Sequence, residues 1–158
     1  MKKIMFVCHG NICRSPMAEF IMKDIVKKAG KENEYLIRSA ATSREEIGHH
    51  IFPPARREMR VRGVWFDEER RAVQITKSAY DNFDYFIVMD DYNYVNLLRI
   101  FGTDPQKKIH KLLDFAEGGE IADPWYTDCF DVAFDEISHG CRALFDFLEQ
   151  NVPRETIV

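Results

Sequence analysis

The chain has 158 residues, 46% of them hydrophobic and 30% charged, and its formal net charge is −4. This length suits one domain over residues 1–158, and the small negative charge does not favour a nucleic-acid or anionic-membrane partner. No apolar run approaches the ~20 residues of a membrane-spanning helix, and the run at 4–8 is shorter than the roughly 7–15 residues of a signal-peptide core. We therefore expect a protein that stays in the cytoplasm. We also expect a monomer, although no feature of the sequence determines the oligomeric state.

Short apolar runs alternate with helical patterns along the chain. Strands are expected at residues 3–7, 35–39, 85–89 and 109–113. Helices are expected at 16–29, 53–63, 92–101 and 128–150, with a helical turn at 76–82 and loops at 40–52 and 114–127. In the first helix Ser15 is the expected N-cap, Pro16 takes the first helical position and Gly30 lies just past the end. This alternation predicts an α/β fold with three layers, in which helices flank a four-stranded parallel sheet.

Ligands of such sheets bind beyond the carboxyl ends of the strands, which draws attention to the loop after the first strand. Backbone N–H groups at the helix N-terminus and the planar guanidinium of Arg14 suit a tetrahedral anion. Gly10 and Asn11 tolerate the left-handed angles that curl successive N–H groups inward. The expected phosphate-binding loop consists of His9, Gly10, Asn11, Ile12, Cys13, Arg14 and Ser15.

Cys8 ends the first strand and faces the same concentration of positive charge. Such surroundings lower the pKa of a cysteine from ~8.5 into the range of roughly 3.5–7.5, so the thiolate becomes available as a nucleophile. Ser15 can donate its hydroxyl to the sulfur, cap the helix, or do both.

The chain has four cysteines, at positions 8, 13, 129 and 141. Their spacing lacks the C-x2–4-C pairs of a structural zinc site, and a cytosolic chain of this size needs no disulfides. We therefore expect no metal and no cofactor. Cys129 and Cys141 fall in the C-terminal helix and are expected to be buried thiols.

The stretch VCHGNICRSPMAE at residues 7–19 resembles the active-site signature of the low-molecular-weight protein tyrosine phosphatases. The resemblance extends to RSAATS at 38–43, FDYFIVMD at 83–90 and DPWY at 123–126. It implies hydrolysis of phosphotyrosine and aryl phosphate monoesters, with phosphotyrosine-containing proteins or small aryl phosphates as substrates. It further implies that Cys8 is the nucleophile that forms a phosphocysteine, that Arg14 binds the phosphate and that Asp123 is the general acid. Two other residues support them: Ser15 stabilises the thiolate, and Asn11 holds the loop through a hydrogen bond with Ser39.

Two Asp-Pro pairs compete for the role of general acid, at Asp104 and at Asp123. The leaving oxygen needs a proton and the second step needs a base, and one carboxyl group can serve both steps. Asp123 follows a predicted strand and therefore lies at the same sheet edge as Cys8. Asp104 precedes a strand, so it belongs to the opposite edge and is expected to be a turn residue.

The walls of the predicted pocket differ from the usual pattern of the family. Trp125 and Tyr126 are expected to form one wall against a substrate ring. Glu45 stands where relatives often place an aromatic residue, which predicts weak selectivity among aryl phosphates and a preference for peptides with basic neighbours. The histidine that the family places near residues 68–72 has no match, although Arg70 and Arg71 lie there. A basic stretch comprises Arg56, Arg57, Arg60, Arg62, Arg70 and Arg71. We expect it to be a solvated face. If it borders the site, it opposes the preference for basic peptides.

Two other functions are compatible with parts of the sequence. A thiol-based reductase on the same fold would use further cysteines in the middle of the chain, whereas residues 14–128 contain none. A phosphate-binding module without activity would tolerate the loss of Cys8 or Asp123, and both are present.

The role of Cys13 stays open between two alternatives. Cys13 either traps an oxidised Cys8 as a disulfide or only packs in the loop.

Overall fold

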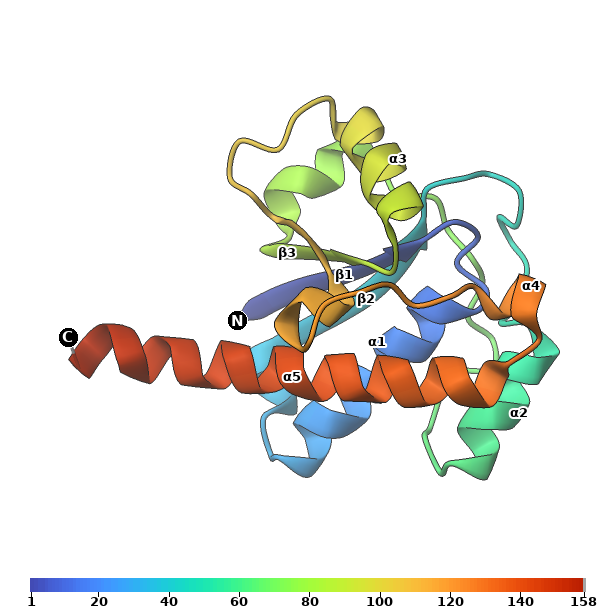
Figure 1. Ribbon diagram of the computed structural model, residues 1–158, viewed down its shortest axis with the longest axis horizontal. Coiled ribbons are helices and arrows are strands. Elements are labelled where there is room, and N and C mark those ends of the chain that lie inside the picture. Colours follow the sequence, from blue (N-terminus) through green and yellow to red (C-terminus); the bar gives the residue numbers. More distant parts are fainter. Residues whose placement is uncertain (158) are drawn as a thin grey trace.

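The computed structural model describes residues 1–157, with side chains up to residue 150. Its centre is a parallel sheet with the strand order β2-β1-β3-β4. The four strands are β1 (Lys2–Cys8), β2 (Tyr35–Ala41), β3 (Tyr85–Val88) and β4 (Ile109–Lys111). Because the strands are parallel, their carboxyl ends share one edge, where the loops after β1 and β3 meet (Figure 1).

Helices cover both faces of the sheet, which confirms the three-layer α/β prediction. The α-helices are α1 (Arg14–Lys28), α2 (Pro53–Val61), α3 (Asp91–Phe101), α4 (Pro124–Thr127) and α5 (Phe130–Ile157). Short 3-10 turns occupy Glu32–Glu34 (η1), Lys77–Asn82 (η2) and Leu112–Phe115 (η3). In Figure 1, α1, α2 and α5 lie on one side of the sheet and α3 on the other.

Strand β1 divides its side chains between two hydrophobic clusters, as the alternation of a buried strand requires. Ile4, Phe6 and Cys8 belong to the larger cluster, which α1 and α5 cover. Met5 and Val7 belong to the smaller cluster, under α3 and η2. The nucleophile candidate is thus anchored by a strand that is buried on both faces.

Several predicted boundaries were wrong. Helix α1 begins at Arg14, and its N-cap is Cys13 rather than Ser15, because the Met17 N–H already donates to the Cys13 carbonyl at 3.1 Å. Strand β2 continues to Ala41, which pairs with Cys8. Strand β4 ends at Lys111, where the chain enters the η3 turn.

The C-terminal part also differs from the expectation. The predicted loop at 114–127 contains the short helix α4, and its C-cap, Asp128, adopts the left-handed conformation (φ 61°). Helix α5 therefore begins at Phe130, two residues later than expected, and leaves Cys129 outside it. Cys129 is exposed, against the prediction, whereas Cys141 is fully buried as predicted.

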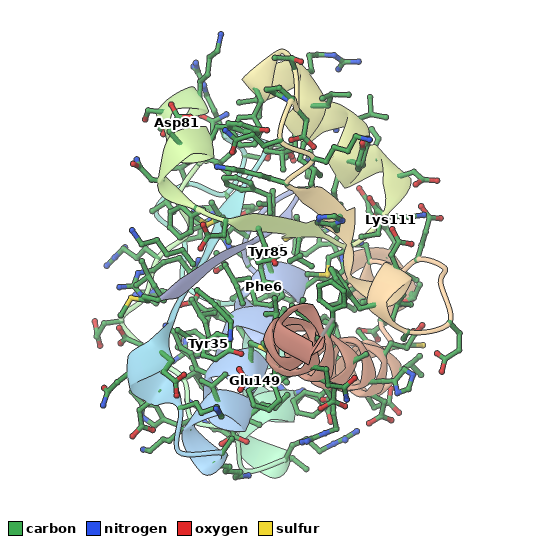
Figure 2. All side chains as sticks on the ribbon, turned by 90° about the vertical axis from the view of Figure 1, so that its left-hand side faces the viewer. Phe6, Tyr35, Asp81, Tyr85, Lys111 and Glu149 are labelled. Carbon is green, nitrogen blue, oxygen red and sulfur yellow. The ribbon has the colours of Figure 1, made fainter. Side chains whose placement is uncertain are left out.

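The far end of α5 is tied to the amino-terminal edge of the sheet through Glu149. Its carboxylate lies 3.1 Å from Lys2 Nζ and 2.7 Å from Lys31 Nζ, and it accepts a hydrogen bond from the Tyr35 hydroxyl. Figure 2 shows Tyr35 and Glu149 next to each other between the sheet and α5. Partial burial alone would raise the pKa of Glu149, but the hydrogen bonds from Lys31, Tyr35 and Lys2 hold it at about 2.

None of the helices in residues 1–157 combines the length and the apolar character that crossing a membrane requires.

Candidate active site

The loop between β1 and α1 folds back over the Cys8 sulfur. The backbone N–H of Asn11 donates to Cys8 Sγ at 3.3 Å, and Ser15 Oγ lies 3.0 Å from the same atom. Asn11 adopts the left-handed conformation (φ 60°), which turns its N–H inward. Gly10 does not, contrary to its expected role; a Cβ there would lie 3.2 Å from Glu46 Cγ, so glycine instead permits close packing.

The Ser15 hydroxyl is directed toward Cys8 by its own hydrogen-bond partner. Asn11 Nδ2 donates to Ser15 Oγ at 2.7 Å and to Ser39 Oγ at 3.1 Å, and the latter is the contact that the family resemblance implies. Because Ser15 Oγ accepts from Asn11, its hydrogen remains available for Cys8 Sγ. A donor so placed stabilises a thiolate more than a thiol.

Arg14 lies almost completely buried, with 2% of its surface exposed. One of its nitrogens, Nη1, donates to Asp90 at 2.7 Å and to the Ile121 carbonyl at 2.8 Å. The other, Nη2, lies 3.5 Å from Asp123 Oδ2. Burial alone would lower the pKa of Arg14, but the charges of Cys8, Asp90 and Asp123 raise it overall, so the guanidinium is a permanent cation at the base of the loop.

Asp123 and Asp104 occupy different surroundings. Asp123 caps α4 by accepting from the Trp125 N–H at 3.0 Å, and its other oxygen faces Arg14. Asp104 accepts from the Tyr80 hydroxyl at 2.5 Å and from the N–H groups of Lys108 and Ile109, in the turn before β4. These bonds outweigh the effect of burial and lower the pKa of Asp104. Asp123 lines the same pocket as Cys8, whereas Asp104 does not.

These groups surround one pocket of about 100 Å³. Trp125 and Tyr126 line the pocket and are 50% and 82% exposed. The Trp125 ring packs against the Phe52 ring, with 4.8 Å between the ring centroids. Glu45 lines the pocket as expected, and its carboxylate lies 2.9 Å from His9 Nε2. The pocket is lined by Cys8, His9, Gly10, Asn11, Ile12, Cys13, Arg14, Glu45, Glu46, Asp123, Trp125 and Tyr126.

Cys13 shares the loop but differs chemically from a nucleophile. Burial, and secondarily the nearby Cys8 and Asp123, raise the pKa of its thiol far above the ordinary value. The Cys13 sulfur therefore stays protonated at neutral pH, which makes it a weak nucleophile in the resting loop.

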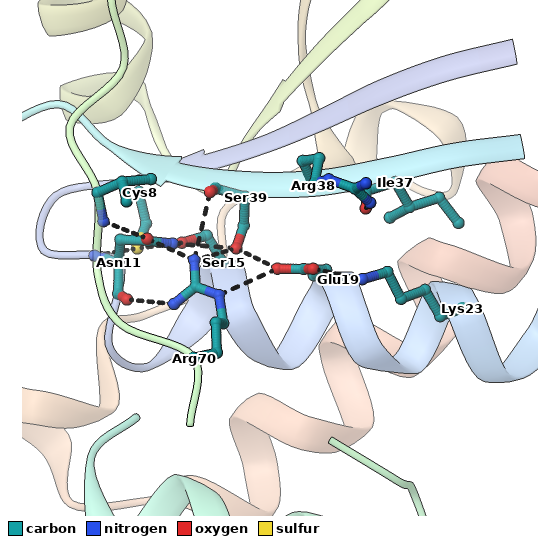
Figure 3. A network of polar contacts seen from close by, with 10 residues as sticks. Cys8, Asn11, Ser15, Glu19, Lys23, Ile37, Arg38, Ser39 and Arg70 are labelled. Atoms are coloured by element: carbon teal, nitrogen blue, oxygen red, sulfur yellow. Dashed lines mark hydrogen bonds and ion pairs between the residues drawn. The ribbon is translucent and has the colours of Figure 1, made fainter. Parts of the chain in front are cut away.

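A network of polar contacts around Arg70 supports the loop (Figure 3). Arg70 Nη2 donates to Asn11 Oδ1 at 2.5 Å and to Ser39 Oγ at 2.7 Å, and Nη1 reaches the Asn11 carbonyl at 3.3 Å. Arg70 Nε lies 3.3 Å from Glu19, which also accepts from Ser39 Oγ at 2.6 Å. Arg70 thus links the loop to Ser39 and Glu19.

Four members of the site were missed by the sequence reasoning, namely Glu19, Glu46, Arg70 and Asp90. Glu19 ends the signature stretch at residues 7–19, but no role was assigned to it, because a carboxylate in a helix is normally solvated. Arg70 was noted only as a neighbour of the missing histidine. Asp90 directly follows the third predicted strand, so the rule that selected the loop after Cys8 could have found it as well.

Comparison with known proteins agrees with this geometry. Residues 3–155 match the model of the family described as low molecular weight phosphotyrosine protein phosphatase. The protein YfkJ of Bacillus subtilis (strain 168), a low molecular weight protein-tyrosine-phosphatase, is 35% identical over 153 residues, which cover 95% of this chain and 97% of that protein. The low molecular weight phosphotyrosine protein phosphatase of Gallus gallus is 33% identical over 165 residues, covering 92% and 95% of the two chains.

Solved structures show the same similarity. The crystal structure of YfkJ from Bacillus subtilis superposes with a TM-score of 0.91 at 34% identity and covers 96% of each chain. The structure of a protein tyrosine phosphatase from Entamoeba histolytica, with Hepes in the active site, gives a TM-score of 0.87 at 32% identity and covers 96% of this chain and 99% of that one. This chain belongs to the low molecular weight phosphotyrosine protein phosphatase family and is a protein tyrosine phosphatase.

Proposed function

We propose that this phosphatase acts on phosphotyrosine-containing proteins and small aryl phosphates through a phosphocysteine on Cys8. In the first step the Cys8 thiolate attacks phosphorus, the S–P bond forms and the P–O bond to the aryl group breaks. Asp123 donates its proton to the leaving oxygen. The bound phosphoryl group is held by Arg14 and by the backbone N–H groups of the loop, which supply the charge that a metal would otherwise bring.

In the second step the phosphocysteine is hydrolysed. Asp123, now a carboxylate, removes a proton from water as the water oxygen attacks phosphorus. The S–P bond breaks and inorganic phosphate leaves. The Ser15 hydroxyl donates a hydrogen bond to the departing Cys8 thiolate, and this bond makes the sulfur a better leaving group.

One observation carries this mechanism. At the base of the pocket, Cys8 Sγ accepts from the Asn11 N–H at 3.3 Å and lies 3.0 Å from Ser15 Oγ, in a loop whose cation is the buried Arg14. Donors aimed at one sulfur stabilise negative charge there, which is needed both for attack and for departure of the thiolate.

The test compares wild type with Cys8→Ser on p-nitrophenyl phosphate in the presence of EDTA. The serine hydroxyl stays protonated in a loop built to stabilise a thiolate, so turnover should be lost while phosphate binding, measured by calorimetry, is retained. Acid quenching of wild type during turnover should trap phosphate on the peptide that contains Cys8. Appreciable hydrolysis by the serine variant would contradict the mechanism.

We also infer that one domain over residues 1–158 acts as a cytoplasmic monomer, without nucleic-acid or membrane partners. Light scattering combined with size-exclusion chromatography tests this state, and a dimer at working concentration would contradict it.

A further inference from the structure

A second, larger depression borders the active-site pocket. It has a volume of about 490 Å³ and shares Ile12, Glu46 and Trp125 with the pocket. We call it the side groove; its remaining residues are Gly48, His49, His50, Ile51, Phe52, Pro53, Arg56 and Arg71. A phosphotyrosine within a polypeptide carries neighbours on both sides, and a groove that shares a wall with the pocket lies within reach of one of them.

The two arginines give the side groove a positive charge. Arg71 is exposed, and its Nη1 donates to the Gly48 carbonyl at 2.9 Å, which fixes the guanidinium at the groove wall. Arg56 packs over the Phe66 ring, with 5.9 Å from Cζ to the ring centroid. Its Nη2 lies 3.3 Å from the Glu68 carboxylate. Arg60 binds the same carboxylate at a shorter distance.

Arg56 also has an unused donor. Within the described part of the chain its Nε is buried and has no hydrogen-bond partner. Leaving a buried charged donor unpaired is costly, and a small turn of the guanidinium toward the groove would let a ligand oxygen remove that cost. The acidic member of the groove, Glu46, is already bound to His49 Nδ1 at 2.5 Å.

We propose that the side groove binds an acidic side chain of the substrate that flanks the phosphotyrosine. Arg56 and Arg71 bind the carboxylate, and the shared wall at Trp125 separates it from the phosphotyrosine ring. Arginine suits this task because its planar fork matches a carboxylate. This inference rests on the proposed function and adds the class of peptide that the enzyme selects.

The proposal reverses the preference for basic neighbours expected from Glu45. Glu45 lines the phosphotyrosine pocket rather than the side groove, and its carboxylate is engaged by His9. Conversely, two arginines of the basic stretch, Arg56 and Arg71, border the site instead of lying on a remote solvated face.

The experiment measures kcat/KM for phosphotyrosine peptides that differ by Glu or Gln at one flanking position at a time. At the position that enters the side groove, wild type should favour Glu by about twofold to fivefold, the range of an exposed charge pair, and the preference should fall with added salt. Arg56→Gln and Arg71→Gln should each bring the Glu/Gln ratio toward one. Arg57→Gln is the matched control, because Arg57 is exposed on the same helix and does not line the groove.

Each outcome distinguishes the proposals. A wild-type ratio of one at every position, or a ratio that both groove variants leave unchanged, overturns the side groove while the phosphatase mechanism stands. Absence of p-nitrophenyl phosphate hydrolysis by wild type overturns the mechanism and the groove together. Since Arg56 packs on Phe66, its replacement can disturb folding; Arg71→Gln, at an exposed site, decides the question in that case.

Discussion

Arg70 donates a 2.5 Å hydrogen bond to Asn11 Oδ1, across 59 residues of sequence. Asn11 is the residue of the phosphate-binding loop that adopts positive φ and points its N–H at Cys8. The same arginine is held by Glu19, with which it forms an ion pair at 3.3 Å. The shape of the loop therefore depends on a side chain that is 13% exposed and does not line the pocket.

From this contact we predict that Arg70→Met lowers kcat/KM by about tenfold or more, the value of one or two hydrogen bonds to a charged group. Arg70→Lys keeps the charge but cannot reach Asn11 and Ser39 together, so it should be almost as slow. The readout specific to positioning is the rate of Cys8 alkylation by iodoacetamide at a fixed pH. This rate should fall in Arg70→Met and stay near wild type in Arg70→Lys. Full activity of the lysine variant would mean that charge alone matters.

The two Asp-Pro motifs provide a matched pair for the general acid. Asp123→Asn should slow phosphotyrosine hydrolysis by about 10²–10⁴, as expected for loss of general acid catalysis. The effect should be much smaller for aryl phosphates whose leaving groups need no proton. Asp104→Asn should leave both rates near wild type and lower the thermal midpoint, because Asp104 accepts three hydrogen bonds in its turn. A loss of rate independent of the leaving group would exclude Asp123 as the acid.

Oxidation should distinguish the two cysteines of the loop. Peroxide should convert the Cys8 thiolate to sulfenic acid, while the high pKa of Cys13 protects its thiol. Attack of the Cys13 sulfur on the Cys8 sulfenic acid then forms a disulfide and releases water. We expect mass spectrometry to find a Cys8–Cys13 link and dithiothreitol to restore activity. If Cys13→Ala recovers from peroxide as fully as wild type, Cys13 only packs in the loop.

The sequence was sufficient for the sheet and for the centre of the site, for a physical reason. Buried parallel strands are short apolar runs, so all four were found, and the sheet-edge rule then placed Cys8 and Asp123 together. Helix and strand ends were less predictable, because Leu112 and Leu113 are apolar and yet form a turn rather than the end of β4.

The supports of the loop could not be found in the same way. Glu19 and Arg70 meet only through tertiary packing, and a charged residue in a helix or a basic stretch is normally solvated. The sequence likewise does not tell which arginine side chains of the basic stretch face the active site. The position of an arginine in α2 is not enough to decide this. The structure distinguishes them: Arg56 is 25% exposed and lines the side groove, while Arg57 is exposed and does not.

The contact of Glu149 with Lys2, Lys31 and Tyr35 predicts how stability depends on acid. The folded-state pKa of Glu149, about 2, lies below the ordinary value of 4.5. A depressed carboxyl pKa stabilises the fold fully above the unfolded value, and this contribution is lost as pH falls from 4.5 toward 2. Urea unfolding followed between pH 7 and pH 2.5 should therefore show a decline below pH 4.5 that is shallower in Glu149→Gln, which should already be less stable at pH 7. Glu32→Gln, at an exposed residue of η1, is the control and should follow wild type. Parallel curves for wild type and Glu149→Gln across this range would show that the cluster does not hold α5 against the sheet.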